Sequence, residues 1–307
     1  MFAITFKPLY MERIWGGRQL ETFYNRQLPS ERTPFGEAWE IVDREDAQSI
    51  VESGPFEGKS LHELWSSHRS EIFGADLPEN YRFPLLIKIL DSAADLSIQV
   101  HPPAAIAETL DGEPKTEMWF IADAKPGSKL YVGLKKGVSR ETFEKSIKDG
   151  TVADQVHSII PKRGDSIFIE SGRLHAIGAG FLIHEIQQNS DTTYRVFDWN
   201  RTDAEGNPRE LHVEESLACI DFDDTEPEMD IPDRNTLATC PYFTTTLHSL
   251  AIGETINSTS PDRFCLITVV SGKLNNTHPT GQTLLLPKGA DPLAATEPTE
   301  VLRITID

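Results

Sequence analysis

The sequence contains little cysteine and no long hydrophobic run. Its three cysteines, Cys219, Cys240 and Cys265, are odd in number and lack C-x-x-C spacing, which argues against a disulfide framework and favours reduced thiols. No stretch approaches the roughly 18 consecutive apolar residues of a membrane-spanning helix, and the N-terminal segment lacks the pattern of a signal peptide. We therefore expect a cytoplasmic protein with no membrane partner.

Basic charge is also scarce. The chain has 29 lysines and arginines and 48 aspartates and glutamates, which gives a formal net charge of −19. A surface of this sign repels nucleic acid and anionic membranes, so neither is an expected partner. Any anionic substrate must therefore be held by a local cluster of basic side chains.

Long helical patterns are missing, and without them a doubly wound parallel sheet cannot be built. Short apolar runs such as FPLLIKIL, MWFIADA and FLIHEIQQ alternate instead with glycine- and proline-rich turns. This rhythm predicts a mainly β protein, either a sandwich or a barrel. Helical patterns occur only as short insertions, at about residues 60–73, 139–149 and 210–221, and Ser60 and Ser139 are candidate N-terminal caps for the first two.

The composition changes after residue 223. Residues 224–239 are acidic and contain two prolines, which is typical of a linker. Residues 240–307 then give a second run of short strands, typical of a small β-barrel. This second unit contains only His248 and His278 as histidines, with no carboxylate at ligand-like spacing, so we expect it to be structural, with residues 1–223 as the catalytic domain.

Four polar residues of the middle third suit one divalent metal ion. Gln99 and His101 occupy alternate positions of the strand-like segment LSIQVHPP, so they share one face. Glu117 opens the next strand, and His175 follows the strand DSIFIE and a glycine turn. Each alone has an ordinary explanation, as a hydrogen-bonded histidine or a surface carboxylate. Together they indicate a metal site, because burying all four without a shared partner would cost several kcal/mol.

Further polar residues surround this group. Lys115 lies two residues before Glu117 and shares its strand face, although an exposed lysine is the simpler interpretation. The stretch HEIQQNSDTTYRVFDWNR contains Glu185 and Arg195 among many polar residues. It is either part of a site or a polar hairpin with cross-strand charge pairs. His157 and His212 are interpreted as structural.

With LSIQVHP, PKTEMWF, SGRLHAIGAG and QQNSDTTYRVFDWNR in hand, the sequence resembles the type I mannose-6-phosphate isomerases in their short bacterial form. The segments YMERIWGG and GEAWEIVDR resemble the opening motifs of that family, and the likeness runs from about residue 5 to 220, with a weaker likeness beyond. The family is built from cupin barrels (double-stranded β-helices, or jelly rolls), so the resemblance implies two cupin-like barrels with short helical insertions. It also implies one divalent metal, usually Zn²⁺.

The resemblance assigns roles to individual residues. The family's metal ligands match Gln99, His101, Glu117 and His175. Its catalytic arginine matches Arg195, its conserved pocket residues match Lys115 and Glu185, and Trp15 in YMERIWGG is expected to bind substrate. The segment GEAWEIVDR departs from the family at Val42 and Asp43, where relatives often carry a serine-rich turn.

The implied reaction interconverts mannose 6-phosphate and fructose 6-phosphate through an enediolate. The metal would polarise and position the sugar oxygens, and Arg195 would stabilise the developing negative charge. Glu185, a hydroxide held by the metal, or a histidine that leaves the metal could move the proton, and we prefer Glu185. Lys115 is expected to contact substrate oxygens or the phosphate.

Two other classes of cupin remain open at this stage. An iron-dependent oxygenase would use a 2-His-1-carboxylate set with open positions, one of which Gln99 would fill. A sugar-binding or regulatory cupin would keep the pocket without catalysing proton exchange.

Overall fold

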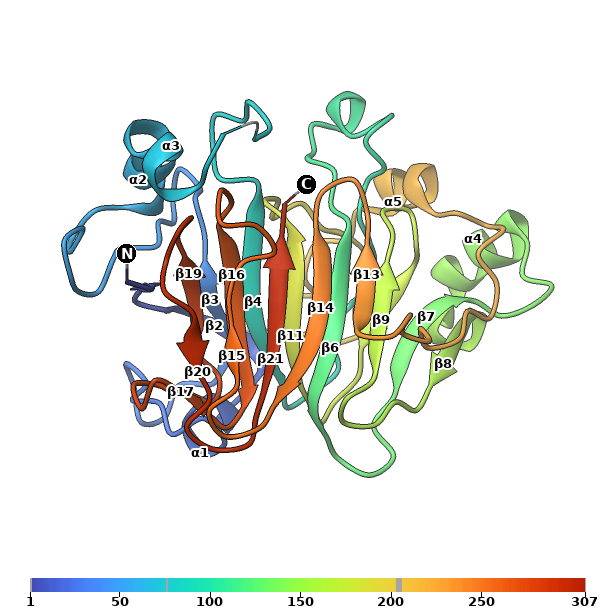
Figure 1. Cartoon of the computed structure of the whole chain (residues 1–307). Coiled ribbons are helices and arrows are strands. Elements are labelled where there is room, and N and C mark those ends of the chain that lie inside the picture. Colours follow the sequence, from blue (N-terminus) through green and yellow to red (C-terminus); the bar gives the residue numbers. More distant parts are fainter. Residues whose placement is uncertain (1, 76, 203–205, 307) are drawn as a thin grey trace.

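The computed structural model describes residues 2–75, 77–202 and 206–306, and the predicted mainly β fold is confirmed. Every pairing between named strands in this part of the chain is antiparallel. Helices are short and lie at the periphery (Figure 1). Within the described residues no helix combines the length and the apolar character needed to cross a membrane.

Two sheets form the barrel of the unit expected to be catalytic, the catalytic barrel. The six-stranded sheet has the order β2 (Leu9–Gly17), β3 (Phe35–Ile41), β4 (Leu85–Ser92), β11 (Phe181–Gln188), β6 (Glu117–Ala124), β9 (Ser166–Ile169). The five-stranded sheet has the order β12 (Tyr194–Phe197), β5 (Ile98–Val100), β10 (His175–Ile177), β7 (Leu130–Leu134), β8 (Val156–Ile159). Apolar side chains of both sheets share one core, which includes Trp119, Val132 and Ile183.

A third sheet packs on the other face of the six-stranded sheet (Figure 1). Its order is β1 (Ile4–Thr5), β19 (Thr283–Leu286), β16 (Cys265–Ser271), β21 (Thr299–Thr305), β14 (Thr244–Leu250), β13 (Thr236–Thr239). Two small sheets complete this unit: β15 (Thr255–Ile256) with β20 (Leu293–Ala294), and β17 (Lys273–Leu274) with β18 (His278–Pro279).

The six-stranded sheet is thus the middle layer of three, and this explains the sequence of β4. All eight residues of LLIKILDS are buried, because the strand is covered on both faces. Leu85 and Ile87 pack towards the third sheet, in one core with Leu266 and Ile304. Residues 86, 88 and 90 point to the opposite face by strand alternation. That opposite face carries the site.

The helices lie where the sequence patterns place them. Helices α2 (Leu61–Ser67) and α3 (Arg69–Ile72) fall within 60–73, and Ser60 accepts a capping hydrogen bond from the Glu63 amide. Helix α4 (Arg140–Asp149) begins after Ser139, and α5 (Val213–Cys219) lies within 210–221. The remaining short elements are α1 (Gln19–Thr22) and two 3-10 turns, Glu108–Leu110 and Val152–Gln155.

The structure corrects the expected boundaries of the second unit at both ends. Strand β1 belongs to the third sheet, since Ile4 pairs with Leu285, so the first residues are not part of the catalytic barrel alone. Strand β13 already begins at Thr236, inside the expected 224–239 linker. The rest of that acidic segment is tied to the catalytic unit, because Asp224 accepts two hydrogen bonds from Arg173.

Candidate active site and metal centre

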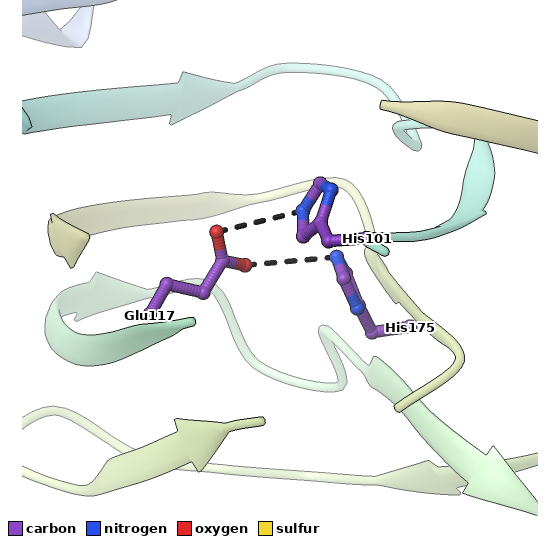
Figure 2. A group of neighbouring side chains, drawn as sticks. All are labelled: His101, Glu117 and His175. Carbon is purple, nitrogen blue, oxygen red and sulfur yellow. Dashed lines mark ion pairs between the residues drawn. The ribbon is translucent and has the colours of Figure 1, made fainter. Parts of the chain in front are cut away.

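Three of the four predicted metal ligands converge between the two sheets of the catalytic barrel. His101 directly follows β5, Glu117 opens β6 and His175 opens β10. Their donor atoms lie within 4.8 Å of one another, and all three residues are buried. Figure 2 shows the Glu117 carboxylate facing both imidazoles, with Oε2 at 3.5 Å from Nε2 of His101 and Oε1 at 3.6 Å from Nε2 of His175.

Backbone carbonyls orient both imidazoles. Nδ1 of His101 lies 2.9 Å from the carbonyl oxygen of Thr192, and Nδ1 of His175 lies 2.9 Å from that of Arg173. A carbonyl can only accept, so each Nδ1 must carry the proton and each neutral ring presents the lone pair of Nε2. Burial lowers the pKa of His175 to about 3. Burial, followed by the Lys115 charge, lowers the pKa of His101 well below its ordinary value.

Lys115 lies against the same donors. Its ammonium is 2.9 Å from Oε2 of Glu117 and 3.1 Å from Nε2 of His101. The simpler interpretation of an exposed lysine is therefore wrong, because Lys115 is buried. Burial raises the pKa of the Glu117 carboxyl, and the Lys115 charge opposes that shift. For Lys115, burial favours the neutral amine, but Glu117 and Glu185 outweigh it and raise the pKa.

Gln99 lies next to this group, on β5 between β10 and β12. It pairs with His175 on one side and with Arg195 on the other. Its Nε2 is 3.4 Å from Nε2 of His175, and its Oε1 accepts a hydrogen bond from Ser97 at 3.3 Å. The amide nitrogen thus faces the donors here, and a half-turn of the amide about its terminal bond would present the oxygen instead.

A cavity of about 370 Å³ opens onto the donor group. Six of the predicted site residues line it: Trp15, Gln99, Lys115, His175, Glu185 and Arg195. His101 and Glu117 lie behind this wall, in contact with Lys115 and His175. The structure therefore brings all eight predicted site residues together.

Glu185 is held by two partners at the floor of the cavity. Its Oε1 accepts a hydrogen bond from the indole of Trp119 at 3.0 Å, and its Oε2 is 3.4 Å from the ammonium of Lys88. Burial alone would raise the pKa of this carboxyl. The positive charges of Lys115 and Lys88 outweigh it and lower the pKa, so Glu185 is ionised at neutral pH.

Arg195 reaches the cavity from β12 and is half-buried. Its Nε donates to the hydroxyl of Ser97 at 3.3 Å, and its Nη1 donates to the carbonyl of Glu210 at 2.8 Å. His212, interpreted from sequence as structural, supports the same strand by accepting a hydrogen bond from the Arg195 amide at 3.3 Å. Two protein contacts thus fix the guanidinium while its Nη2 donates to no described residue.

Five charged residues outside the predicted site set also line the cavity: Arg13, Glu37, Lys88, Asp191 and Arg209. Arg13 forms a bidentate pair with Glu37, which also accepts the Trp39 indole N–H at 2.7 Å. Arg209 donates twice to the buried carboxylate of Asp198. The cavity is therefore lined by five basic side chains in a chain whose net charge is −19.

The predicted alternative of a polar hairpin is wrong. Strand β11, with Glu185, pairs with β4 and β6, whereas β12, with Arg195, pairs with β5 in the other sheet. The chain crosses from one wall of the barrel to the other between them. Their polar side chains consequently face one cavity from two sides.

A sequence signal existed for one of the residues outside the predicted site set. Lys88 interrupts the apolar run FPLLIKIL, and a lysine in a strand covered on both faces needs a partner or a cavity. Arg13 and Glu37 form an ion pair between two strands, β2 and β3, and the local sequence around neither residue predicts that pair.

The sequence of this chain is similar to those of known isomerases. Residues 3–117 match the model of the type I phosphomannose isomerase catalytic domain. Mannose-6-phosphate isomerase ManA of Bacillus subtilis is 38% identical over 87% of this chain and 85% of its own. The mannose-6-phosphate isomerase of Streptococcus mutans is 35% identical over 87% of this chain and 86% of its own.

Solved structures agree with the sequence relatives. The crystal structure of the mannose 6-phosphate isomerase from Bacillus subtilis superposes with a TM-score of 0.87 and 31% identity, covering 100% of both chains. A putative mannosephosphate isomerase from Archaeoglobus fulgidus, at 21% identity and a TM-score of 0.80, shares the fold. The resemblance stated from the sequence motifs is thereby confirmed, and the chain belongs to the type I mannose-6-phosphate isomerase family.

Proposed function

We propose that this enzyme interconverts mannose 6-phosphate and fructose 6-phosphate with one divalent metal ion, Zn²⁺, held between the two sheets of its barrel. The observation that carries the proposal is the convergence of His101, Glu117 and His175 beside a cavity rich in basic side chains. The relatives named above, mannose-6-phosphate isomerases, support the choice of substrate.

The donor atoms fit a metal. Both histidines present an Nε2 lone pair, and Oε1 of Glu117 accepts no hydrogen bond from the described residues although it is fully buried. Leaving such an oxygen unpartnered is costly, and a cation would remove that cost. Two imidazoles and a carboxylate suit zinc, and the amide oxygen of Gln99 would be the fourth ligand after the half-turn described above.

The bound ion would act as a Lewis acid for the sugar oxygens at C1 and C2. Arg195 adds a fixed positive charge from β12, the strand beside Gln99, and its Nη2 can donate to the oxygen on which negative charge develops. Lys115 is buried and engaged with Glu117, so we assign it to a sugar oxygen near the metal ligands rather than to the phosphate. Trp15 would pack against the sugar at the cavity wall.

Glu185 is the proposed base. It is ionised at neutral pH, and Trp119 and Lys88 fix its orientation. Its carboxylate would take the proton from C2 of the aldose and deliver it to C1, and the reverse direction would use the same group. The phosphate dianion would lie towards Arg209, another basic side chain of the cavity wall.

A coupled assay with mannose 6-phosphate tests substrate, reaction and metal together. We expect turnover that prolonged chelation abolishes and Zn²⁺ restores, and we expect Glu117→Gln to lose both metal and activity. His157→Gln, a histidine outside the cavity, is the matched control and should behave as the wild type.

Three results would contradict the proposal. Full activity in a demonstrably metal-free sample would exclude the metal role. Oxygen uptake with iron would favour an oxygenase instead. Tight binding of the sugar phosphate without exchange of its C2 proton with solvent would indicate a sugar-binding protein.

We also propose a cytoplasmic location. Cys219, Cys240 and Cys265 are thiols rather than disulfides in the structure, as a reducing compartment would keep them.

A further inference from the structure

We propose that Thr192 is a positioning residue for His101, acting through its own backbone carbonyl and held in place by its hydroxyl. The inference rests on the metal-binding role proposed above for His101. It concerns a residue outside the donor set, on the segment that joins the two walls of the barrel.

The carbonyl of Thr192 decides which nitrogen of His101 is available. It accepts the Nδ1–H at 2.9 Å, and the ring is fully buried. With Nδ1 protonated, the Nε2 lone pair faces Glu117 and Lys115. If the carbonyl moved away, the proton could shift to Nε2. The ring would then lose the Nε2 lone pair that a metal ion beside Glu117 requires.

No strand ladder holds that carbonyl. Residues 189–193 lie between the end of β11 and the start of β12 and belong to neither strand. Their position depends on contacts with Glu113 instead. The hydroxyl of Thr192 accepts the Glu113 amide at 2.9 Å, and Ser190 Oγ donates to the Glu113 carbonyl at 3.2 Å. Ser190 Oγ also accepts the Thr192 amide at 3.2 Å.

Arg44 joins the same two segments from a third direction. Its Nη1 donates to Oε2 of Glu113 at 2.8 Å and to the carbonyl of Asn189 at 3.1 Å. The segments are also packed closely, because a Cβ added to Gly112 would clash with the Tyr194 hydroxyl and lie 3.0 Å from Cγ2 of Thr192. The two segments are therefore fixed relative to one another.

This connection sets the distance between donors that come from different sheets. The segment after Glu113 leads directly to Lys115 and Glu117, while Thr192 holds His101, which follows β5 of the opposite wall. The Thr192 hydroxyl thus ties the imidazole of one wall to the carboxylate of the other.

Thr192→Val tests the inference, because it removes the hydroxyl acceptor and keeps the branched shape. In the metal-free wild type, ¹⁵N NMR of the imidazoles should show the Nδ1–H tautomer at both His101 and His175. In the variant only His101 should become a mixture, since His175 is held by Arg173. The dissociation constant for Zn²⁺ should rise about tenfold, the lower end for loss of a group that orients a metal ligand.

Two variants make the result specific. Thr192→Ser restores the hydroxyl and should restore both the tautomer and the affinity for Zn²⁺. Thr109→Val is the control: that hydroxyl also bonds a backbone group, donating to the Ile106 carbonyl, but has no link to His101, so both readouts should match the wild type.

The inference is overturned if Thr192→Val keeps the wild-type tautomer and affinity, or if Thr192→Ser fails to recover them. Should Thr192→Val not fold, Ser190→Ala decides in its place, because it removes one bond to the Glu113 carbonyl and one from the Thr192 amide and is expected to shift both readouts in the same direction. Failure of the wild type to bind Zn²⁺ would refute the proposed function, whereas the tautomer comparison in metal-free protein would still test Thr192.

Discussion

Lys88 offers the sharpest test of how the cavity is held together, through the variant Lys88→Met. The side chain is buried, at 3% exposure, and its ammonium lies 3.4 Å from Oε2 of Glu185. It is also the leading positive charge that lowers the pKa of Glu37 against the effect of burial. Methionine keeps the volume but leaves two buried carboxylates short of one positive charge.

The magnitude follows from the geometry. Two unit charges 3.4 Å apart interact by about 5 kcal/mol at an effective dielectric constant of about 20. Removing one partner of a buried ion pair costs about 3–5 kcal/mol by experience with other proteins. We therefore expect Lys88→Met to lower the free energy of unfolding by about 3–5 kcal/mol at pH 7.5, measured by urea denaturation.

The difference in the free energy of unfolding between Lys88→Met and the wild type should become smaller as the pH falls. Burial raises the pKa of Glu185, and the positive charge of Lys88 helps to lower it. Without Lys88 this pKa rises, so the folded variant binds a proton at a pH at which the unfolded chain does not. A group with a raised pKa stabilises the folded state more as pH falls. At about 1.4 kcal/mol per pH unit for one proton, the difference between variant and wild type should narrow by about 1–2 kcal/mol between pH 7.5 and 5.5.

Lys129→Met, an exposed lysine before β7, is the matched control and should change stability by less than about 0.5 kcal/mol. A loss below about 1 kcal/mol for Lys88→Met, or a loss that does not vary with pH, would refute the reasoning about the two carboxylates.

Three further predictions concern the site and the core. Arg195→Ala should lower kcat by about 10²–10³ with metal content unchanged, measured by the coupled assay and metal analysis, and a near-normal kcat would remove Arg195 from the chemistry. Prolonged chelation should lower Tm of the wild type but not of Glu117→Gln, measured by calorimetry, and an equal drop in both would place the lost metal elsewhere. His184 is buried, bonded to Tyr24 at 3.0 Å, and burial lowers its pKa to about 3, so the stability it contributes is present above pH 6.5 and is lost as pH falls towards 3. His184→Gln should therefore reduce the stability lost by the Zn²⁺-loaded protein between pH 6.5 and 4.5 by about 2 kcal/mol, measured by urea denaturation, and an unchanged loss would contradict that assignment.

Much of the site could be predicted because the local sequence pattern around several of its residues is unusual for an ordinary strand. Strand alternation placed Gln99 and His101 on one face. A buried imidazole and a buried amide each need a polar partner, and one metal ion can serve both. Glu117 and His175 both open strands, as the turn residues before them indicated. The orientation of the Gln99 amide was not predictable, because it depends on the hydroxyl of Ser97.

The errors have a common physical cause, since local patterns do not show which strands become neighbours. The polar stretch containing Glu185 and Arg195 was also compatible with a hairpin, yet β11 and β12 belong to different sheets. The acidic segment after residue 223 has the composition of a linker, but Asp230 accepts the Phe168 amide and fixes it to β9. Composition indicates a loop, and only the fold shows what the loop packs on.

The position of β1 has a consequence for biosynthesis. Ile4 leaves the ribosome long before its partner Leu285, because the two residues are far apart in the sequence. The third sheet therefore cannot be completed until β21 has left the ribosome, and the face of the middle sheet that it covers stays open until then. A nascent chain can assemble the catalytic barrel early, but a long-range contact of this kind is expected to be a slow and late step. Truncated products that end before β19 would expose that apolar face and should depend on chaperones.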